Sequence, residues 1–256
     1  MAMMLRSAAL ATMAGLRHGF FTRQGGISEG AWASLNIGLR GGDVAERVAV
    51  NRARAAAALA AKPDRLVLAR QVHGATTLTV QAPWDHADAP EADALVTDRP
   101  GLLLGVLTAD CGPVLLADPA AGVIGAAHAG WKGALGGVLE AVVAAMADLG
   151  AEPGRITAAI GPCIAQASYE VGPEFVERFV ATDPDSGPFF VAGPVRARFD
   201  LAGYAAARLR RAGIGRLDDL ARDTCADEAS FFSYRRATLR GEAQFGLQLS
   251  AIVLAG

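Results

Sequence analysis

The side chains best suited to chemistry in this chain are two histidines and a cysteine. His73, Cys111 and His128 each follow an apolar segment of the 256-residue sequence, and each has a glycine within the next two residues. Two imidazoles and a thiolate suit zinc, and a catalytic zinc keeps an open position for water or substrate. The long gaps between the three residues favour a site collected from separate strands over a compact structural finger. These residue types and spacings allow a catalytic centre with one zinc per chain, or alternatively with copper.

The same residues allow other interpretations. A histidine at a strand end is commonly a hydrogen-bonded structural residue, and a single buried cysteine commonly belongs to the core. Cys111 could instead be the nucleophile of a cysteine hydrolase, with His73 or His128 as its base. If Cys163 were a fourth ligand, the zinc would be closed, which would favour a regulatory or binding module. We expect Cys163 to lie near the site without binding the metal, and the sequence assigns no role to Cys225.

Three consecutive apolar runs must position these groups. Residues 102–107, 114–117 and 122–127 predict strands, and the first run is nearly uninterrupted. Such a run indicates a strand that is buried on both faces. Groups at the ends of such strands can face one cavity, which is where sheet proteins commonly place their ligands.

The rest of the pattern predicts further helices and strands. Asp43 and Asp200 are the predicted N-caps of the helices that follow them. Residues 135–149 predict one amphipathic helix, and residues 231–236 predict an edge strand. Residues 247–254 predict the closing strand of the chain.

Strands and helices do not alternate strictly along the sequence, and no repeat or linker divides it. We therefore predict an α/β (α+β) fold, with mixed β-sheets flanked by helices. The prediction is a single domain that spans residues 1–256.

Composition limits the classes of function. The net charge of −2 and the pI of 6.1 give no support for binding nucleic acid or an anionic membrane. Three cysteines do not form a secreted disulfide framework, and the N-terminal residues do not form a convincing signal peptide. No segment is long and apolar enough to span a bilayer. We therefore expect a cytoplasmic protein without a nucleic-acid or membrane partner, and the oligomeric state stays open.

Several motifs resemble the laccase-domain, or polyphenol-oxidase-like, family. They are, in order, QVHG, TADCGPVLL, AAHAGWKG, IGPCI…YEVG and FFSYRR. The resemblance extends from about His18 to the C-terminus, and the combination of TADC with HAGW is specific. Members of the family are described as zinc-dependent purine nucleoside phosphorylases with adenosine deaminase activity. The resemblance therefore implies zinc ligands at His73, Cys111 and His128. It also implies phosphate and purine nucleosides such as adenosine, inosine and methylthioadenosine as substrates.

The histidine count argues against the chemistry in the family's name. A multicopper laccase binds several copper ions, mostly through imidazoles in H-x-H pairs. This chain has four histidines, and no two of them are separated by a single residue. It also lacks the H-x-E and P-C-x-x-C motifs of cytidine-type deaminases.

The two implied reactions need different groups. Phosphorolysis requires a bound phosphate, and we predict that Arg23, Lys132 and Arg235 bind substrate or phosphate. Deamination requires an activated water, which a zinc ion can supply. Asp110 and Glu170 are the candidate acid and base, and either could instead orient a ligand histidine.

Overall fold

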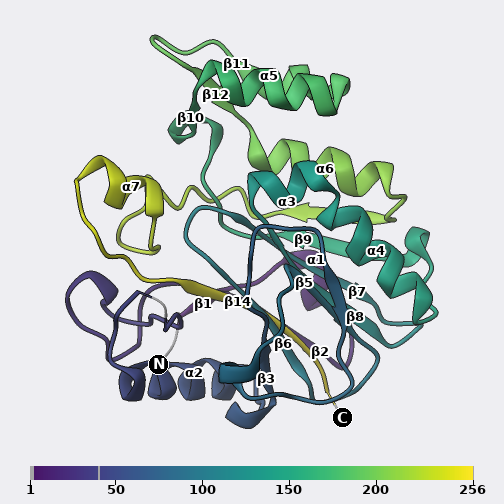
Figure 1. The fold of residues 1–256 in the computed structure, drawn as a ribbon. Coiled ribbons are helices and arrows are strands. Elements are labelled where there is room, and N and C mark those ends of the chain that lie inside the picture. Colours follow the sequence, from purple (N-terminus) through teal and green to yellow (C-terminus); the bar gives the residue numbers. More distant parts are fainter. Residues whose placement is uncertain (1–2, 40, 256) are drawn as a thin grey trace.

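The computed structural model describes residues 3–39 and 41–255, and two large β-sheets form its centre (Figure 1). The five-stranded sheet consists, in order, of β1 (Met4–Leu5), β2 (Leu16–Phe21), β14 (Gln248–Leu254), β6 (Leu103–Thr108) and β3 (Leu66–Leu68). The six-stranded sheet consists of β13 (Arg216–Asp219), β9 (Thr157–Ile160), β7 (Gly112–Asp118), β8 (Val123–Ala129), β5 (Ala94–Thr97) and β4 (Thr77–Thr79). A small sheet consists of β10 (Glu170–Val171), β12 (Ala197–Phe199) and β11 (Phe190–Val191).

Helices cover the outer faces of the large sheets. The α-helices are α1 (Ala8–Ala11), α2 (Ala45–Ala58), α3 (Trp131–Gly136), α4 (Val138–Asp148), α5 (Pro173–Thr182), α6 (Leu201–Arg211) and α7 (Tyr234–Leu239). Short 3-10 helices lie at η1 (Gly30–Trp32), η2 (Pro63–Arg65), η3 (His86–Asp88), η4 (Pro153–Arg155), η5 (Gln166–Ser168) and η6 (Pro184–Phe189). Among the described residues, no helix has both the length and the apolar character needed to cross a membrane.

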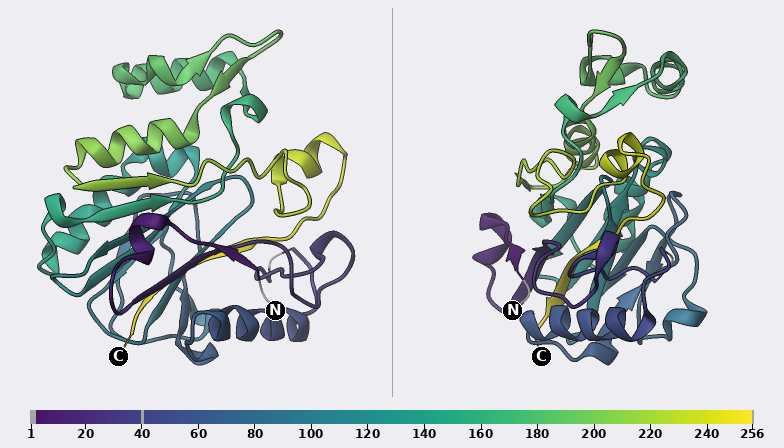
Figure 2. Two further views of the ribbon diagram at one scale, coloured as in Figure 1. Left: turned by 180° about the vertical axis from the view of Figure 1, so that it is seen from behind. Right: turned by 90° about the vertical axis from the view of Figure 1, so that its left-hand side faces the viewer.

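Alternating side chains define four layers. In β7, Val114 and Leu116 belong to the cluster that includes α4 and α6, whereas Leu115 belongs to the cluster between the two large sheets. In β14, Ile252 belongs to that inner cluster, whereas Ala251 packs with α2. Because successive strand residues point to opposite faces, each large sheet is buried on both sides. The layers are therefore the α3–α4–α6 helices, the six-stranded sheet, the five-stranded sheet and α2 (Figures 1 and 2).

A smaller unit of α5 and the three-stranded sheet extends beyond α6 (Figure 2). Aromatic side chains connect it to the main body. Phe179 of α5 lies 4.6 Å from Phe199 of β12 and 5.2 Å from Tyr204 of α6, measured between ring centroids. All three side chains are buried, so this contact belongs to the core rather than to a surface hinge.

The structure confirms the mixed α/β architecture and four of the five predicted strands. The apolar runs at 102–107, 114–117 and 122–127 correspond to β6, β7 and β8, and the closing strand is β14. Asp200 also caps α6 as predicted, because its Oδ1 accepts a hydrogen bond from the Gly203 N–H at 2.9 Å.

Two helix predictions were wrong in detail. Val44 is the N-cap of α2, and the Asp43 carboxylate instead accepts hydrogen bonds from Ser28 and Asn36. The helix predicted over 135–149 is divided into α3 and α4 at Gly137, whose φ of +97° favours glycine.

The prediction of an edge strand at 231–236 was also wrong. Ser233 accepts a hydrogen bond from the Arg236 N–H at 3.1 Å, and α7 begins immediately after it. The serine N-cap thus overrides the strand propensity of the two preceding phenylalanines.

Candidate metal centre

The three predicted ligands come together in space. One ligand atom from each of His73, Cys111 and His128 lies within 4.8 Å of the others. The Cys111 Sγ is 3.9 Å from the His73 Nε2, and the two imidazole rings are nearly perpendicular with centroids 4.8 Å apart. The side chain of His73 is exposed, Cys111 is half-buried and His128 is buried. The cluster therefore has one side open to an incoming ligand.

Strand pairing and a tight connection position these residues. His128 lies in β8 opposite Pro113 of β7, and Cys111 is the residue immediately before β7. Antiparallel pairing of β7 with β8 therefore brings the thiol beside the imidazole. His73 lies in the connection between β3 and β4, with a positive φ of 61°. The site thus lies where the connections of the two large sheets meet.

A buried aspartate holds two of the ligands. One Asp93 oxygen lies 2.8 Å from the His128 Nδ1 and accepts the His73 N–H at 2.9 Å. The other oxygen accepts the N–H groups of Val72 and Gly74. With a proton on Nδ1, the His128 Nε2 is left as the metal-binding atom. Asp93, rather than Asp110 or Glu170, therefore contacts a ligand histidine.

No sequence signal singled out Asp93. It precedes the short strand β5 and lies far from both histidines in the sequence. Only the general rule that ligand histidines donate to a carboxylate could have prompted a search for such a residue. The rule does not say which of the 26 acidic residues supplies it.

Glycine at position 130 is required by space rather than by backbone conformation. A Cβ there would lie 2.9 Å from the His73 Cδ2 and 3.2 Å from the Cys111 Sγ. The cluster would have to shift to accept any side chain. The glycine in HAGW therefore allows the chain to pass directly beside the ligands.

Cys111 and His128 change each other's protonation. Burial alone would raise the pKa of Cys111, but His128 and His73 outweigh burial and lower the pKa to about 6. Burial would lower the pKa of His128, but the Cys111 thiolate and Asp93 raise the pKa to about 9. Without a metal, the pair at neutral pH is therefore a thiolate and an imidazolium.

The predicted acid and base have other contacts. Asp110 is buried and accepts hydrogen bonds from the hydroxyls of Thr224 and Ser233 and from the Arg235 N–H. It connects three segments of the chain. Glu170 is exposed, and its carboxylate is 3.9 Å from Arg198.

The predicted phosphate-binding cations lie outside the cavity described below. Arg235 donates to the Glu170 carbonyl at 3.0 Å and lies over the Tyr169 ring. Lys132 is exposed, with its Nζ 5.5 Å from the centroid of Trp131. Arg23 lines a separate pocket of about 410 Å³, where its Nε donates to the Ala33 carbonyl at 2.7 Å.

The two remaining cysteines are not members of the cluster. Cys163 is buried, and its backbone pairs with Arg222 and Thr224. Burial raises the pKa of the Cys163 thiol, which keeps it protonated. Cys225 is half-buried, and burial raises the pKa of its thiol as well.

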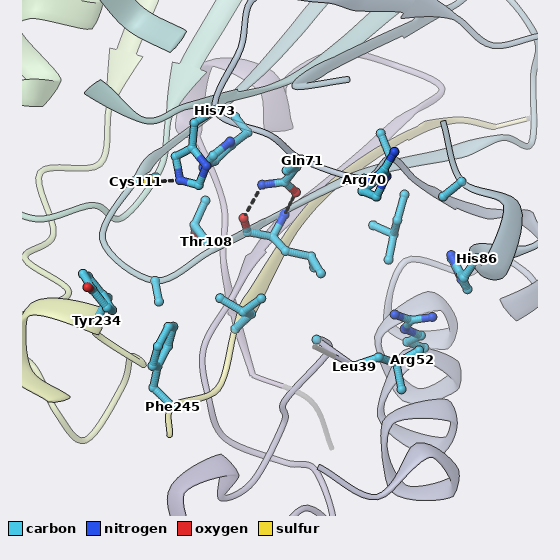
Figure 3. Close-up of a pocket in the computed structure, with 18 of the residues that line it drawn as sticks. Leu39, Arg52, Arg70, Gln71, His73, His86, Thr108, Cys111, Tyr234 and Phe245 are labelled. Carbon is cyan, nitrogen blue, oxygen red and sulfur yellow. Dashed lines mark hydrogen bonds between the residues drawn. The ribbon is translucent and has the colours of Figure 1, made fainter. Parts of the chain in front are cut away.

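The cluster opens into a cavity of about 880 Å³ (Figure 3). The rings of Tyr234 and Phe245 line the cavity on the same side as the cluster (Figure 3), with their centroids 5.2 Å apart. The Gln71 side chain forms hydrogen bonds with both the backbone N–H and the carbonyl of Leu107, each at 2.8 Å. These bonds hold the two residues together where they line the cavity. Such a volume is typical of a pocket for a small organic ligand.

Fold and site together define a four-layer α/β protein with a His–Cys–His cluster of metal-ligand type in a ligand-sized cavity. Residues 17–255 match the family described as "Multi-copper polyphenol oxidoreductase laccase", and the chain belongs to this family. A purine nucleoside phosphorylase of Deinococcus radiodurans is 48% identical over 221 residues, which cover 86% of this chain and 83% of the relative. A purine nucleoside phosphorylase of Streptomyces coelicolor is 42% identical over 231 residues, covering 90% of this chain and 94% of the relative. The crystal structure of YlmD from Geobacillus stearothermophilus has a TM-score of 0.88 and 32% identity, and 100% of both chains is covered.

The family description names several copper ions, which would need further histidine ligands. The positions of the remaining histidines are therefore relevant. Within residues 3–39 and 41–255, His73, Cys111 and His128 form the one group of three or more potential ligands. His18 is buried elsewhere and accepts the Ser7 N–H at 2.9 Å. His86 lines the cavity but lies outside the group. The described histidines therefore do not assemble a second centre.

Proposed function

We propose that this protein is a zinc-dependent purine nucleoside phosphorylase that acts on adenosine and inosine, and also on methylthioadenosine. The observation that carries the proposal is the His–Cys–His cluster at one end of a ligand-sized cavity. The names of the relatives from Deinococcus radiodurans and Streptomyces coelicolor support the choice of reaction.

The residues present fit a zinc ion. The donor set of two imidazole nitrogens and one thiolate sulfur matches the ligands of a catalytic zinc. Asp93 presents the His128 Nε2, and the neighbouring imidazoles favour the thiolate of Cys111. When bound, zinc supplies a Lewis acid with a position for a substrate or water ligand.

The protein's own residues would bind and orient the nucleoside. We propose that the purine stacks against Tyr234 and Phe245, whose rings line the cavity on the same side as the cluster (Figure 3). Aromatic faces favour a planar base over a flexible aliphatic ligand. Adenosine deamination would use the same cavity, with water in place of phosphate, and is proposed as a side activity.

A cysteine hydrolase is the second candidate. The lowered pKa of Cys111 and the 3.9 Å separation from the His73 Nε2 favour it, since a thiolate beside an imidazole is a nucleophile–base pair. A hydrolase would keep its activity after chelation of the metal. A phosphorylase of the proposed kind would lose it.

Metal analysis paired with an inosine assay tests the proposal. Protein purified without chelator should contain about one zinc per chain and should convert inosine and phosphate to hypoxanthine and ribose 1-phosphate. Removal of the metal should abolish the reaction, and zinc should restore it. Turnover that is unchanged in metal-free protein would exclude the zinc-dependent reaction.

A further inference from the structure

Basic side chains line the end of the cavity that lies away from the His–Cys–His cluster. Arg52, Arg70 and His86 line this end, whereas His73 and Cys111 line the other end (Figure 3). Arg52 comes from α2, Arg70 follows β3 and His86 begins η3. Three separate segments of the chain thus place basic side chains around one volume.

Arg52 has no counter-ion among the residues that the structure describes. Its Nε donates to the Ile37 carbonyl at 3.1 Å, and its two terminal nitrogens make no hydrogen bond with described residues. Burial lowers the pKa of Arg52 to about 10, so the guanidinium is still charged at neutral pH. A half-buried cation without a partner is unfavourable, and a bound anion would offset that cost.

The neighbouring groups do not form an ion pair with Arg52. Arg70 is half-exposed and forms a 2.7 Å ion pair with Glu91. Burial, followed by the charge of Arg52, lowers the pKa of His86 to about 4, so His86 is a neutral hydrogen-bonding group. Asp88 also lines the cavity, and it is exposed. Arg52 is thus the cation of this group that forms no ion pair with a described residue.

We propose that this end of the cavity is a subsite for a phosphate group, held by Arg52 with support from Arg70 and His86. A guanidinium presents two parallel N–H donors that match two phosphate oxygens. The phosphate is either the orthophosphate co-substrate, in which case the inference rests on the proposed phosphorylase, or the 5′-phosphate of a nucleotide. Both sources share the same chemistry, and binding measurements separate them.

The test is calorimetric titration of the zinc-containing protein with sodium phosphate, with adenosine and with adenosine 5′-monophosphate. The variants are Arg52→Gln and Arg70→Gln. Arg47→Gln is the matched control, because Arg47 lies on the same helix, pairs with Glu29 and does not line the cavity. Arg52→Gln should weaken binding of the phosphate-bearing ligand about tenfold or more, as expected for a lost charge-assisted hydrogen bond. Arg70→Gln should weaken it less, and Arg47→Gln should leave it unchanged.

The ligand whose binding Arg52→Gln weakens shows whether the subsite takes orthophosphate or the 5′-phosphate of a nucleotide. Weaker binding of orthophosphate, with adenosine and its monophosphate equal in the unchanged protein, assigns the subsite to the co-substrate. A preference for the monophosphate over adenosine that disappears in Arg52→Gln, with orthophosphate unaffected, assigns it to a 5′-phosphate.

Two results would overturn the subsite. One is equal affinity of the Arg52→Gln and Arg47→Gln proteins for both phosphate ligands, and the other is no binding of either ligand to the unchanged protein. If Arg52→Gln does not fold, the half-exposed Arg70→Gln decides the same question. Inosine turnover is measured separately, so phosphate binding without turnover would retain the subsite and reject the phosphorylase.

Discussion

We expect the proposed metal centre to depend most on Cys111. Its thiolate is the softest of the three ligands, and two imidazoles alone bind zinc weakly. We expect Cys111→Ala to lose zinc and nearly all inosine turnover while it remains folded, because the side chain is half-buried and lies outside the apolar core clusters. Elemental analysis, circular dichroism and the inosine assay measure these outcomes. Full turnover by a metal-free Cys111→Ala protein would contradict the assignment.

Asp93 is a positioning residue. In Asp93→Asn, one oxygen becomes an amide donor, so the side chain can no longer accept all four hydrogen bonds that it accepts from His128 and the 72–74 backbone. We expect zinc affinity to fall by roughly 10- to 100-fold, measured by competition with a chelator. Asp98→Asn, just beyond the other end of β5, is the control and should bind zinc normally. Similar losses in both variants would indicate damage to the strand rather than to ligand orientation.

The pKa shifts predict how zinc binding depends on pH. His128 has its pKa raised to about 9 and Cys111 has its pKa lowered to about 6, so the metal-free protein carries an imidazolium and a thiolate between these values. Zinc must displace the imidazolium proton, and therefore about one proton is released per zinc at neutral pH. The apparent affinity should rise with pH until about 9 and should fall more steeply below 6, where the thiol is protonated as well.

Calorimetry in buffers of different ionisation enthalpy measures that proton release. In Asp93→Asn, one of the groups that raise the pKa of His128 is absent. As pH rises, proton release on zinc binding should therefore decline at a lower pH than in the unchanged protein. Proton release that stays constant from pH 6 to pH 10 would contradict the imidazolium–thiolate pair.

Arg23 contacts segments of the chain that are distant in the sequence. Arg23 donates to the carbonyls of Ala33 and Glu228 and lies 4.5 Å from the centroid of the Phe232 ring. We expect Arg23→Ala to lower the melting temperature because it breaks these links between distant segments. The phosphate dependence of inosine turnover should not change. A large rise in the phosphate requirement without loss of stability would instead favour the phosphate-binding role predicted from the sequence.

The elements differ in how far their sequences determine them. The strands β6 to β8 were predictable, because apolar runs bounded by polar residues have few alternative structures. The helix at 234–239 was not, because two phenylalanines favour a strand until the Ser233 cap is recognised. The division at Gly137 was likewise hidden within one amphipathic pattern.

The residues of the candidate site also differ in how far the sequence predicts them. The clustered residues His73, Cys111 and His128 were predictable from residue type, because histidine and cysteine are rare in this chain and these three follow apolar runs. Asp93 and Arg52 were not, because their importance depends on contacts between segments that are distant in sequence. The folded chain alone reveals that one carboxylate reaches two ligands and that one arginine lacks a counter-ion.

In the molecule as a whole, the proposed ligands lie on segments of both large sheets. His73 follows β3 of the five-stranded sheet, Cys111 lies between β6 and β7, which belong to different sheets, and His128 lies in β8 of the six-stranded sheet. A metal held by all three residues therefore binds the folded chain and not the separated segments. Ligand binding of this kind stabilises the native state by mass action, by about 2.7 kcal/mol at a hundredfold excess over the dissociation constant.

Zinc should therefore raise the melting temperature by about 5–10 °C for a chain of this size. Scanning calorimetry of metal-free protein, with and without added zinc, measures the shift. Cys111→Ala is the control and should show little response, because it lacks one ligand from the connection between the sheets. An equal shift in both proteins would place the stabilising zinc elsewhere. No shift in the unchanged protein would mean that the cluster does not bind zinc tightly enough to hold the two sheets together.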